Sequence, residues 1–147
     1  MIVLATTLFG LSFLQYGIAV VPFLLVLFLF GIALGIAASA LVLWLGPASE
    51  WLIWPIPALI APFAGVFYPV STLPGGMRAI SYALPPSPVF EGMRAIVAGQ
   101  GVSAVALLLG GVLAVLYLAL ACWLFTLIYR RAVRVGLIAR YSAENIS

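Results

Sequence analysis

The 147-residue chain is 67% hydrophobic and only 6% charged, with six arginines, three glutamates and a net charge of +3. A soluble domain could not stay dissolved with so little charge, so the composition indicates an integral membrane protein. The sequence contains no histidine, aspartate or lysine, which argues against a histidine base, a metal hydrolase and a phosphate-binding loop ending in Gly-Lys-Ser/Thr. We therefore expect no catalytic, cofactor-binding or metal-ligating residues, and the positive charge indicates membrane topology rather than nucleic-acid binding.

Four apolar stretches are candidate membrane spans, because about 20 apolar residues cross the hydrocarbon core as a helix. They cover residues 2–17, 22–45, 52–70 and 102–129. A non-spanning segment, residues 71–101, separates the last two. We expect an all-α integral membrane fold: a polytopic helical bundle over residues 1–129 with an external re-entrant helical hairpin before the last span, followed by a tail over residues 130–147.

The orientation is predicted by the arginines that follow the last span. The positive-inside rule places such a segment in the cytoplasm, and the tail contains Arg130, Arg131, Arg134 and Arg140. The C-terminus and the loop 46–51 are then cytoplasmic, and the segment 71–101 is external. Arg78 and Arg94 lie on the outer side and count against this orientation, but they are outnumbered.

The third predicted span is studded with prolines. Pro55 and Pro57 fit a helix start, where the missing N–H has no partner to lose. Pro62 is interior and removes the hydrogen bond to the carbonyl of Ala58, so a kink is expected there. A bent helix that lines a pathway and a static kink are equally compatible with this pattern, because membrane helices tolerate proline.

The sequence of the segment 71–101 predicts two short helices. Pro74-Gly75-Gly76 predicts a break, residues 77–84 a first helix, and Ser87 with Pro88 the N-cap and first turn of a second helix over residues 88–98. Glu91 and Arg94 are three residues apart and can form an ion pair. The pattern favours a hairpin that dips into the outer leaflet, and an interfacial loop that lies flat is the alternative. No nucleophile accompanies the Glu–Arg pair, so a catalytic role is not expected.

Small residues recur on two predicted spans. Gly31, Gly35 and Ser39 lie four residues apart, and Gly110 and Ala114 form a shorter stripe. Such stripes let helices approach closely. We favour packing within the chain over a dimerisation face for both.

The spans carry no Asp, Glu, His, Lys or Arg, which argues against a proton-coupled or ion-coupled pump. An apolar wall suits amphipathic or lipidic cargo. A pathway through this chain would be lined by aromatic residues of the second and third spans: Phe30, Phe63, Phe67 and Tyr68.

A set of spaced motifs lies within residues 62–94: Phe67-Tyr68-Pro69, Leu73-Pro74, Ile80, Leu84-Pro85, and Glu91 three residues before Arg94. This region resembles the signature region of type-2 ABC exporter permeases, which end in a span, an external helical hairpin and a final span. Leu84 departs from the pattern, since the family often has Asn there. The order of elements fits the whole chain, whereas the specific motif covers about a quarter of it.

The resemblance implies a six-span permease of the plasma (bacterial inner) membrane, of which this chain holds the last four spans. The apolar start at Met1, without flanking charges, agrees with a C-terminal part of a longer protein. The family pairs as dimers with a second permease copy and binds a cytoplasmic nucleotide-binding ATPase subunit, which carries ATP and Mg. In the loop 46–51, Glu50 and Trp51 are the expected ATPase contacts. Gating is assigned to the kink and hairpin residues Pro62, Pro69, Pro74, Arg78, Glu91 and Arg94.

The function expected from these observations is export of an amphipathic substrate, such as a drug, lipid or glycan, powered by ATP hydrolysis on the partner subunit. The chain itself is not expected to be an enzyme. A non-transporting membrane scaffold or assembly subunit is the alternative. An intramembrane enzyme would lack a metal or an acid/base pair, and a secondary transporter would lack buried charge.

Overall fold

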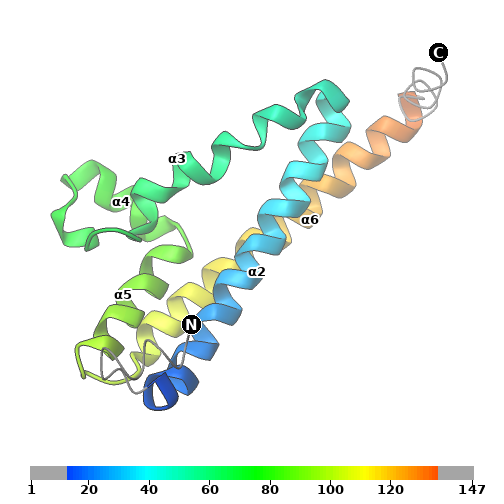
Figure 1. Cartoon of the computed structure of the whole chain (residues 1–147). Helices are drawn as coiled ribbons and strands as arrows, with labels where there is room; N and C mark the ends of the chain where they lie inside the picture. The colour runs from blue at the N-terminus through cyan, green and yellow to red at the C-terminus, as the bar shows by residue number, and fades with distance from the viewer. Residues whose placement is uncertain (1–12, 136–147) are drawn as a thin grey trace.

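The structure is a computed structural model that describes residues 13–135. All regular elements in this range are helical and none is a strand, which confirms the all-α fold class for these residues (Figure 1). Their order is α2 (Phe13–Leu45), the 3₁₀ turn η1 (Pro47–Leu52), α3 (Pro55–Ala64), the 3₁₀ turn η2 (Val70–Thr72), α4 (Gly75–Ala83), α5 (Pro86–Val97) and α6 (Ala104–Val135).

Two of these helices are long and apolar enough to cross a membrane. α2 has 33 residues and α6 has 32, so each is roughly 50 Å long at the rise of an α-helix, more than the hydrocarbon thickness of about 30 Å. Only 22% of the most apolar window of α2 and 17% of that of α6 are buried. Their exposed apolar faces need lipid or other helices, so both helices are compatible with membrane spans.

α2 and α6 lie side by side and run in the same direction (Figure 1). Near their starts, Ala106 of α6 packs against the buried cluster that includes Phe23 of α2. Further along, the rings of Phe30 and Tyr117 meet edge to face, with centroids 5.6 Å apart. The C-terminal end of α2, the turn η1 and the C-terminal end of α6 therefore lie at one end of the molecule, and the turn between α5 and α6 lies at the other.

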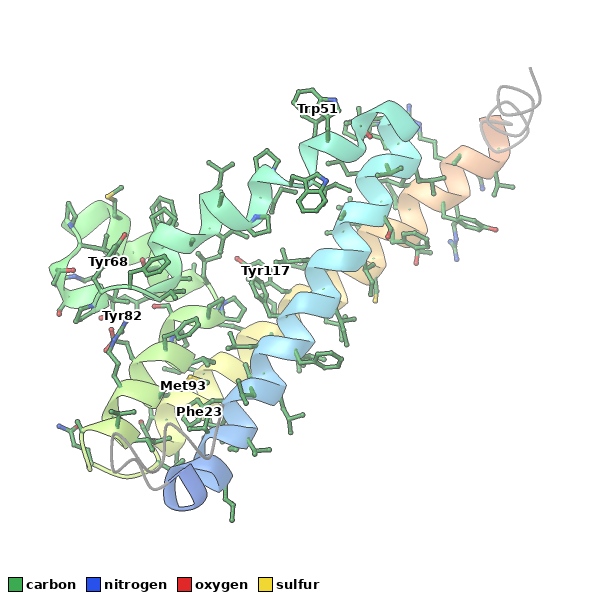
Figure 2. The ribbon with its side chains drawn as sticks, viewed as in Figure 1. Phe23, Trp51, Tyr68, Tyr82, Met93 and Tyr117 are labelled. Carbon is green, nitrogen blue, oxygen red and sulfur yellow. The ribbon has the colours of Figure 1, made fainter. Side chains whose placement is uncertain are left out.

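α5 packs into the N-terminal half of the α2–α6 pair. The buried core there consists of Phe23 from α2 and of Val89 and Ile96 from α5. Figure 2 shows Met93 of α5 beside Phe23, and its side chain packs against this core. α3 and α4 extend away from the long helices and join them mainly through α5 and η1.

The first helical boundary differs from the predicted one. Residues 13–45 form one helix that continues through Pro22, so no turn separates the predicted spans 2–17 and 22–45. A proline can lie inside an apolar helix because neighbouring groups take over the freed carbonyl. Residues 2–12, most of the first predicted span, lie outside the described residues, as does the tail from residue 136 with Arg140.

The range 52–70 also differs from a continuous helix. Only Pro55–Ala64 is α-helical, and ten residues are about 15 Å long, half of the hydrocarbon thickness. The helix ends where Gly65 adopts a left-handed conformation, with φ of 70°. This is a common way to end a helix, because glycine has no Cβ to clash.

The two helices predicted in the hairpin are present, with different starts. Gly75 and Gly76 form the first turn of α4 rather than a break before it. α5 begins at Pro86, so the prediction that Ser87 caps it is wrong. Ser87 is fully buried in the first turn, and its hydroxyl has no hydrogen-bond partner. The helix starts earlier, at Pro85 and Pro86, because the fixed φ angle of proline matches that of the first helical turn.

The two small-residue stripes have opposite environments. Gly110 and Ala114 are buried in contact with the rest of the chain, which confirms packing within the chain. Gly31, Gly35 and Ser39 are exposed, and nothing lies within 4 Å of a Cβ added at either glycine. The expectation of internal packing is wrong for the stripe on α2. A different face of α2, which includes Phe30, contacts α6.

Candidate functional site

The site is a polar junction between the loop that follows α3 and the residues Glu91 and Arg94 of α5, which the sequence singled out. The C-terminal end of α3 leaves backbone carbonyls without partners in the helix, and these carry partial negative charge. Arg94 of α5 reaches across and donates hydrogen bonds to the carbonyl of Gly65, to that of Tyr68 at 3.0 Å and to that of Val66 at 3.4 Å. One guanidinium therefore binds three carbonyls of the loop that follows α3.

Glu91 completes the junction. Its Oε1 accepts a hydrogen bond from the backbone N–H of Val70 at 2.8 Å and lies 3.1 Å from Nη1 of Arg94. The ion pair predicted from the spacing of these two residues is confirmed. Their side chains are 38% and 32% exposed, respectively, so the pair lies at the edge of the packed region. The carboxylate neutralises the arginine and satisfies a backbone donor of the same loop.

Arg78 of α4 holds the next part of the chain. Its Nη2 donates to the carbonyl of Ser71 at 2.5 Å and to that of Leu73 at 3.2 Å. Its Nε is buried and has no hydrogen-bond partner. The connection between α3 and α4 is thus bound by one arginine from α5 and one from α4. We call Arg78, Glu91, Arg94 and the backbone of residues 65–73 the arginine junction.

Gly65 is a part of this junction that the sequence analysis missed. Its backbone φ is 70°, and a Cβ at this position would lie 3.0 Å from Cγ2 of Val70. A larger residue would be strained in its backbone and would push the loop away from Arg94. The available signal was a glycine directly after an apolar helical stretch, which is typical of a helix C-terminus.

Two further glycines, one in α5 and one in α6, allow α5 to pack closely on the long helices. A Cβ added at Gly92 would lie 2.5 Å from Cε1 of Phe23, and one added at Gly110 would lie 2.9 Å from Cγ2 of Val89. α5 therefore approaches α2 and α6 more closely than any side chain at these positions allows. Gly110 was singled out in the sequence, whereas Gly92 was not, because it follows no four-residue repeat.

The aromatic residues proposed for a pathway do not form one wall. Phe30 is only 5% exposed and is enclosed between α2 and α6, where it contacts Tyr117. Phe67, in contrast, is 82% exposed beyond the end of α3, and Phe63 is half-buried. Figure 2 places Tyr68 on the hairpin side, apart from Tyr117 on α6. Phe30 has too little free surface to line a pathway in this arrangement.

The three prolines assigned to gating occupy different positions along this segment. Pro62 is exposed in the last turn of α3, and its carbonyl accepts a hydrogen bond from the hydroxyl of Tyr68 at 2.7 Å. Pro69 precedes η2, and Pro74 precedes α4 with an extended backbone. Pro69 and Pro74 therefore precede helical elements beside the arginine junction, and of the three prolines only Pro62 lies inside a helix.

The residues assigned to ATPase contact lie at the opposite end of the molecule from the turn between α5 and α6. Both belong to η1, which follows α2. Trp51 is 68% exposed, and Figure 2 shows it projecting from this end. Glu50 is in the same turn, and its side chain lies outside the described part of the structure.

Comparison with protein-family models, with curated proteins and with solved structures finds no match to this chain. The interpretation of the site therefore depends on its own geometry. Apart from the buried Nε of Arg78, its charged groups are engaged with backbone partners, and the arrangement holds α4 and α5 against the loop that follows α3.

Proposed function

We propose that the chain is the membrane-spanning permease part of an ATP-driven exporter, with ATP hydrolysed by a partner subunit. The observation that carries the proposal is the α4–α5 hairpin, which precedes the last long helix and is held at one end of the molecule by the arginine junction. This order of elements is the one implied by the resemblance to type-2 ABC exporter permeases. The exposed apolar faces of α2 and α6 support a location within a membrane.

In this proposal, α2 and α6 cross the plasma membrane, the hairpin faces outward and η1 faces the cytoplasm with the arginine-rich end of α6. Partner ATPase subunits would bind at η1, and a second permease copy would complete the transporter. The arginine junction would move the hairpin together with the end of α3. An amphipathic cargo would leave outward or into the outer leaflet.

The proposal is tested by co-purification. The gene is expressed from its native locus with a C-terminal tag, the protein is extracted in mild detergent, and mass spectrometry identifies the bound chains. We expect a stoichiometric nucleotide-binding ATPase. An intact, folded preparation that retains no ATPase would contradict the exporter and favour the scaffold alternative.

A matched pair of variants tests the position of the ATPase contact. Trp51→Ala removes an exposed aromatic side chain from η1. Tryptophan contacts often contribute about 2 kcal/mol, so ATPase retention should fall by roughly thirtyfold in affinity. The control Gln100→Ala changes an exposed residue at the opposite end and should retain the ATPase. Equal retention by both variants would exclude Trp51 as an ATPase contact.

A further inference from the structure

A groove lies between the C-terminal ends of α2 and α6. Its volume is about 510 Å³, within the range of small-molecule sites. The groove is apolar except at one end, where a guanidinium contributes. The residues that define it are Leu41 and Trp44 from α2 and Leu127, Ile128 and Arg131 from α6.

The charged end of this groove continues onto a hollow on α6. Leu127 and Arg131 line both, and the hollow adds Trp123, Arg130 and Arg134. The three arginines are exposed, and residues 122–135 include no acidic residue. The ion pair found among the described side chains joins Arg94 to Glu91. It belongs to α5 and does not involve the arginines of α6.

The position of the arginines along α6 matches the edge of a membrane. The apolar part of α6 before Arg130 has 26 residues, counted from Ala104 to Tyr129, and is roughly 39 Å long. This is longer than the hydrocarbon core of about 30 Å, so the arginines lie at the polar surface while the groove runs into the apolar layer. Trp44 lines the groove together with Arg131, and tryptophan is enriched at the polar surface of membranes.

We infer that this groove binds an anionic phospholipid. One of its two acyl chains lies between α2 and α6 against Leu41 and Ile128, and its phosphate accepts hydrogen bonds from the guanidinium groups at the open end. Arginine suits this role because its planar fork binds two phosphate oxygens at once. A free phosphate would leave the apolar groove unfilled, so the lipid is the occupant that matches both halves of the site. This inference needs membrane insertion but does not depend on ATP-driven export.

The experiment uses Trp44 as the reporter, since it lines the groove. In the full chain, Trp51, Trp54 and Trp123 are changed to Phe, and the protein is reconstituted in phosphatidylcholine vesicles. Quenching of Trp44 fluorescence is measured with equal small fractions of brominated phosphatidylglycerol or brominated phosphatidylcholine. One interfacial arginine attracts anionic lipid by a factor of roughly five, so we expect the anionic lipid to quench several-fold more effectively.

Two sets of variants identify the groups responsible. Changing Arg130, Arg131 and Arg134 together to Gln should remove the preference for the anionic lipid, whereas changing them together to Lys should retain most of it, because the positive charge is kept. Circular dichroism and gel filtration show whether each variant is folded. As a positional control, a tryptophan-free chain with Phe28→Trp reports an exposed site of α2 outside the groove, where both lipids should quench equally.

Four results would overturn the inference. The first is equal quenching of Trp44 by the two lipids, and the second is a preference that survives the triple Gln change. The third is loss of the preference with inorganic phosphate but not with chloride at the same ionic strength, which would assign the arginines to a soluble anion. The fourth is protection of Trp44 from both lipids together with disulfide cross-linking through Cys122, which would mean that a second copy covers the groove.

Discussion

Arg94 connects parts of the chain that are far apart in sequence. Its guanidinium binds the carbonyls of Gly65, Val66 and Tyr68, and Glu91 binds the N–H of Val70. These groups follow the end of α3, where the helix itself offers the last carbonyls no partner. The pair therefore supplies hydrogen-bond partners to the loop between α3 and η2, which accounts for a charged pair in such an apolar protein.

Replacing Arg94 tests this role. Hydrogen bonds to charged groups contribute about 1.5–3 kcal/mol, and partial exposure reduces this, so we expect Arg94→Gln to lower the free energy of unfolding by about 1–2 kcal/mol. Arg94→Lys keeps the charge but not the planar fork, so its free energy of unfolding should lie between that of the unchanged protein and that of Arg94→Gln. The measurement is thermal unfolding in neutral detergent, together with hydrogen exchange at the amide of Val70.

Arg134→Gln is the matched control, because it removes one exposed arginine outside the junction. It should leave unfolding in neutral detergent unchanged. A thermal midpoint for Arg94→Gln equal to that of the control, with protection of the Val70 amide retained, would show that the junction contributes nothing to stability.

The sequence predicted the pairing of Glu91 with Arg94 but not what the pair binds. Residues three apart on a helix are neighbours, so spacing alone is sufficient for that contact. The backbone partners lie 21 to 29 residues earlier in the chain, and their approach depends on the left-handed turn at Gly65 and on the packing of α5. Neither is encoded in local spacing. For the same reason, Gly65 was missed although it directly follows the helix.

At the scale of helices, the seating of α5 depends on glycines at the contact. Gly92 faces the ring of Phe23, and Gly110 faces Val89. Because neither glycine has a side chain, the Phe23 ring and the Val89 side chain lie directly against the glycine backbones, and α5 is held close to both long helices. This packing determines where the arginine junction lies.

Gly92→Ala should disrupt this contact. The added methyl would overlap the Phe23 ring and approach Ala106 at 3.1 Å, and overpacking of a well-packed core typically costs about 1–3 kcal/mol. We expect a loss of stability in that range. It is measured by chemical or thermal unfolding in detergent.

Gly35→Ala in α2 is the control for Gly92→Ala, because it also replaces a glycine inside a helix by alanine. Nothing lies within 4 Å of an added Cβ there, and alanine is favoured over glycine in a helix by about 1 kcal/mol. This variant should be neutral or more stable. Equal destabilisation by the two substitutions would contradict the packing of α5 on Phe23.

Helix type and order were predictable from composition and hydrophobic length, whereas several boundaries were not. The last predicted span, residues 102–129, corresponds to α6, which continues to Val135 because arginine is a good helix former. The predicted span over residues 52–70 is interrupted because one glycine adopts a left-handed conformation, which hydropathy does not register. The outward face of Gly31 and Gly35 depends on which side of α2 meets α6, and a four-residue repeat alone does not specify its partner.

At the scale of the whole molecule, the parallel course of α2 and α6 organises the rest. It places η1 beside the arginine-rich end and the turn between α5 and α6 at the far end (Figure 1). The proposed ATPase contact and the lipid groove share the first end, and the hairpin belongs to the other half.

The central claim is that α2 and α6 cross a membrane in this arrangement, and site-directed labelling tests it most directly. In a Cys122→Ser background, single cysteines replace Trp51, Arg134 or Gln100, and intact cells and inverted vesicles are treated with a membrane-impermeant maleimide. We predict that positions 51 and 134 react only from the cytoplasmic side and that position 100 reacts only from outside. Labelling of positions 51 and 134 from opposite sides, or of all three from the same side, would contradict the account.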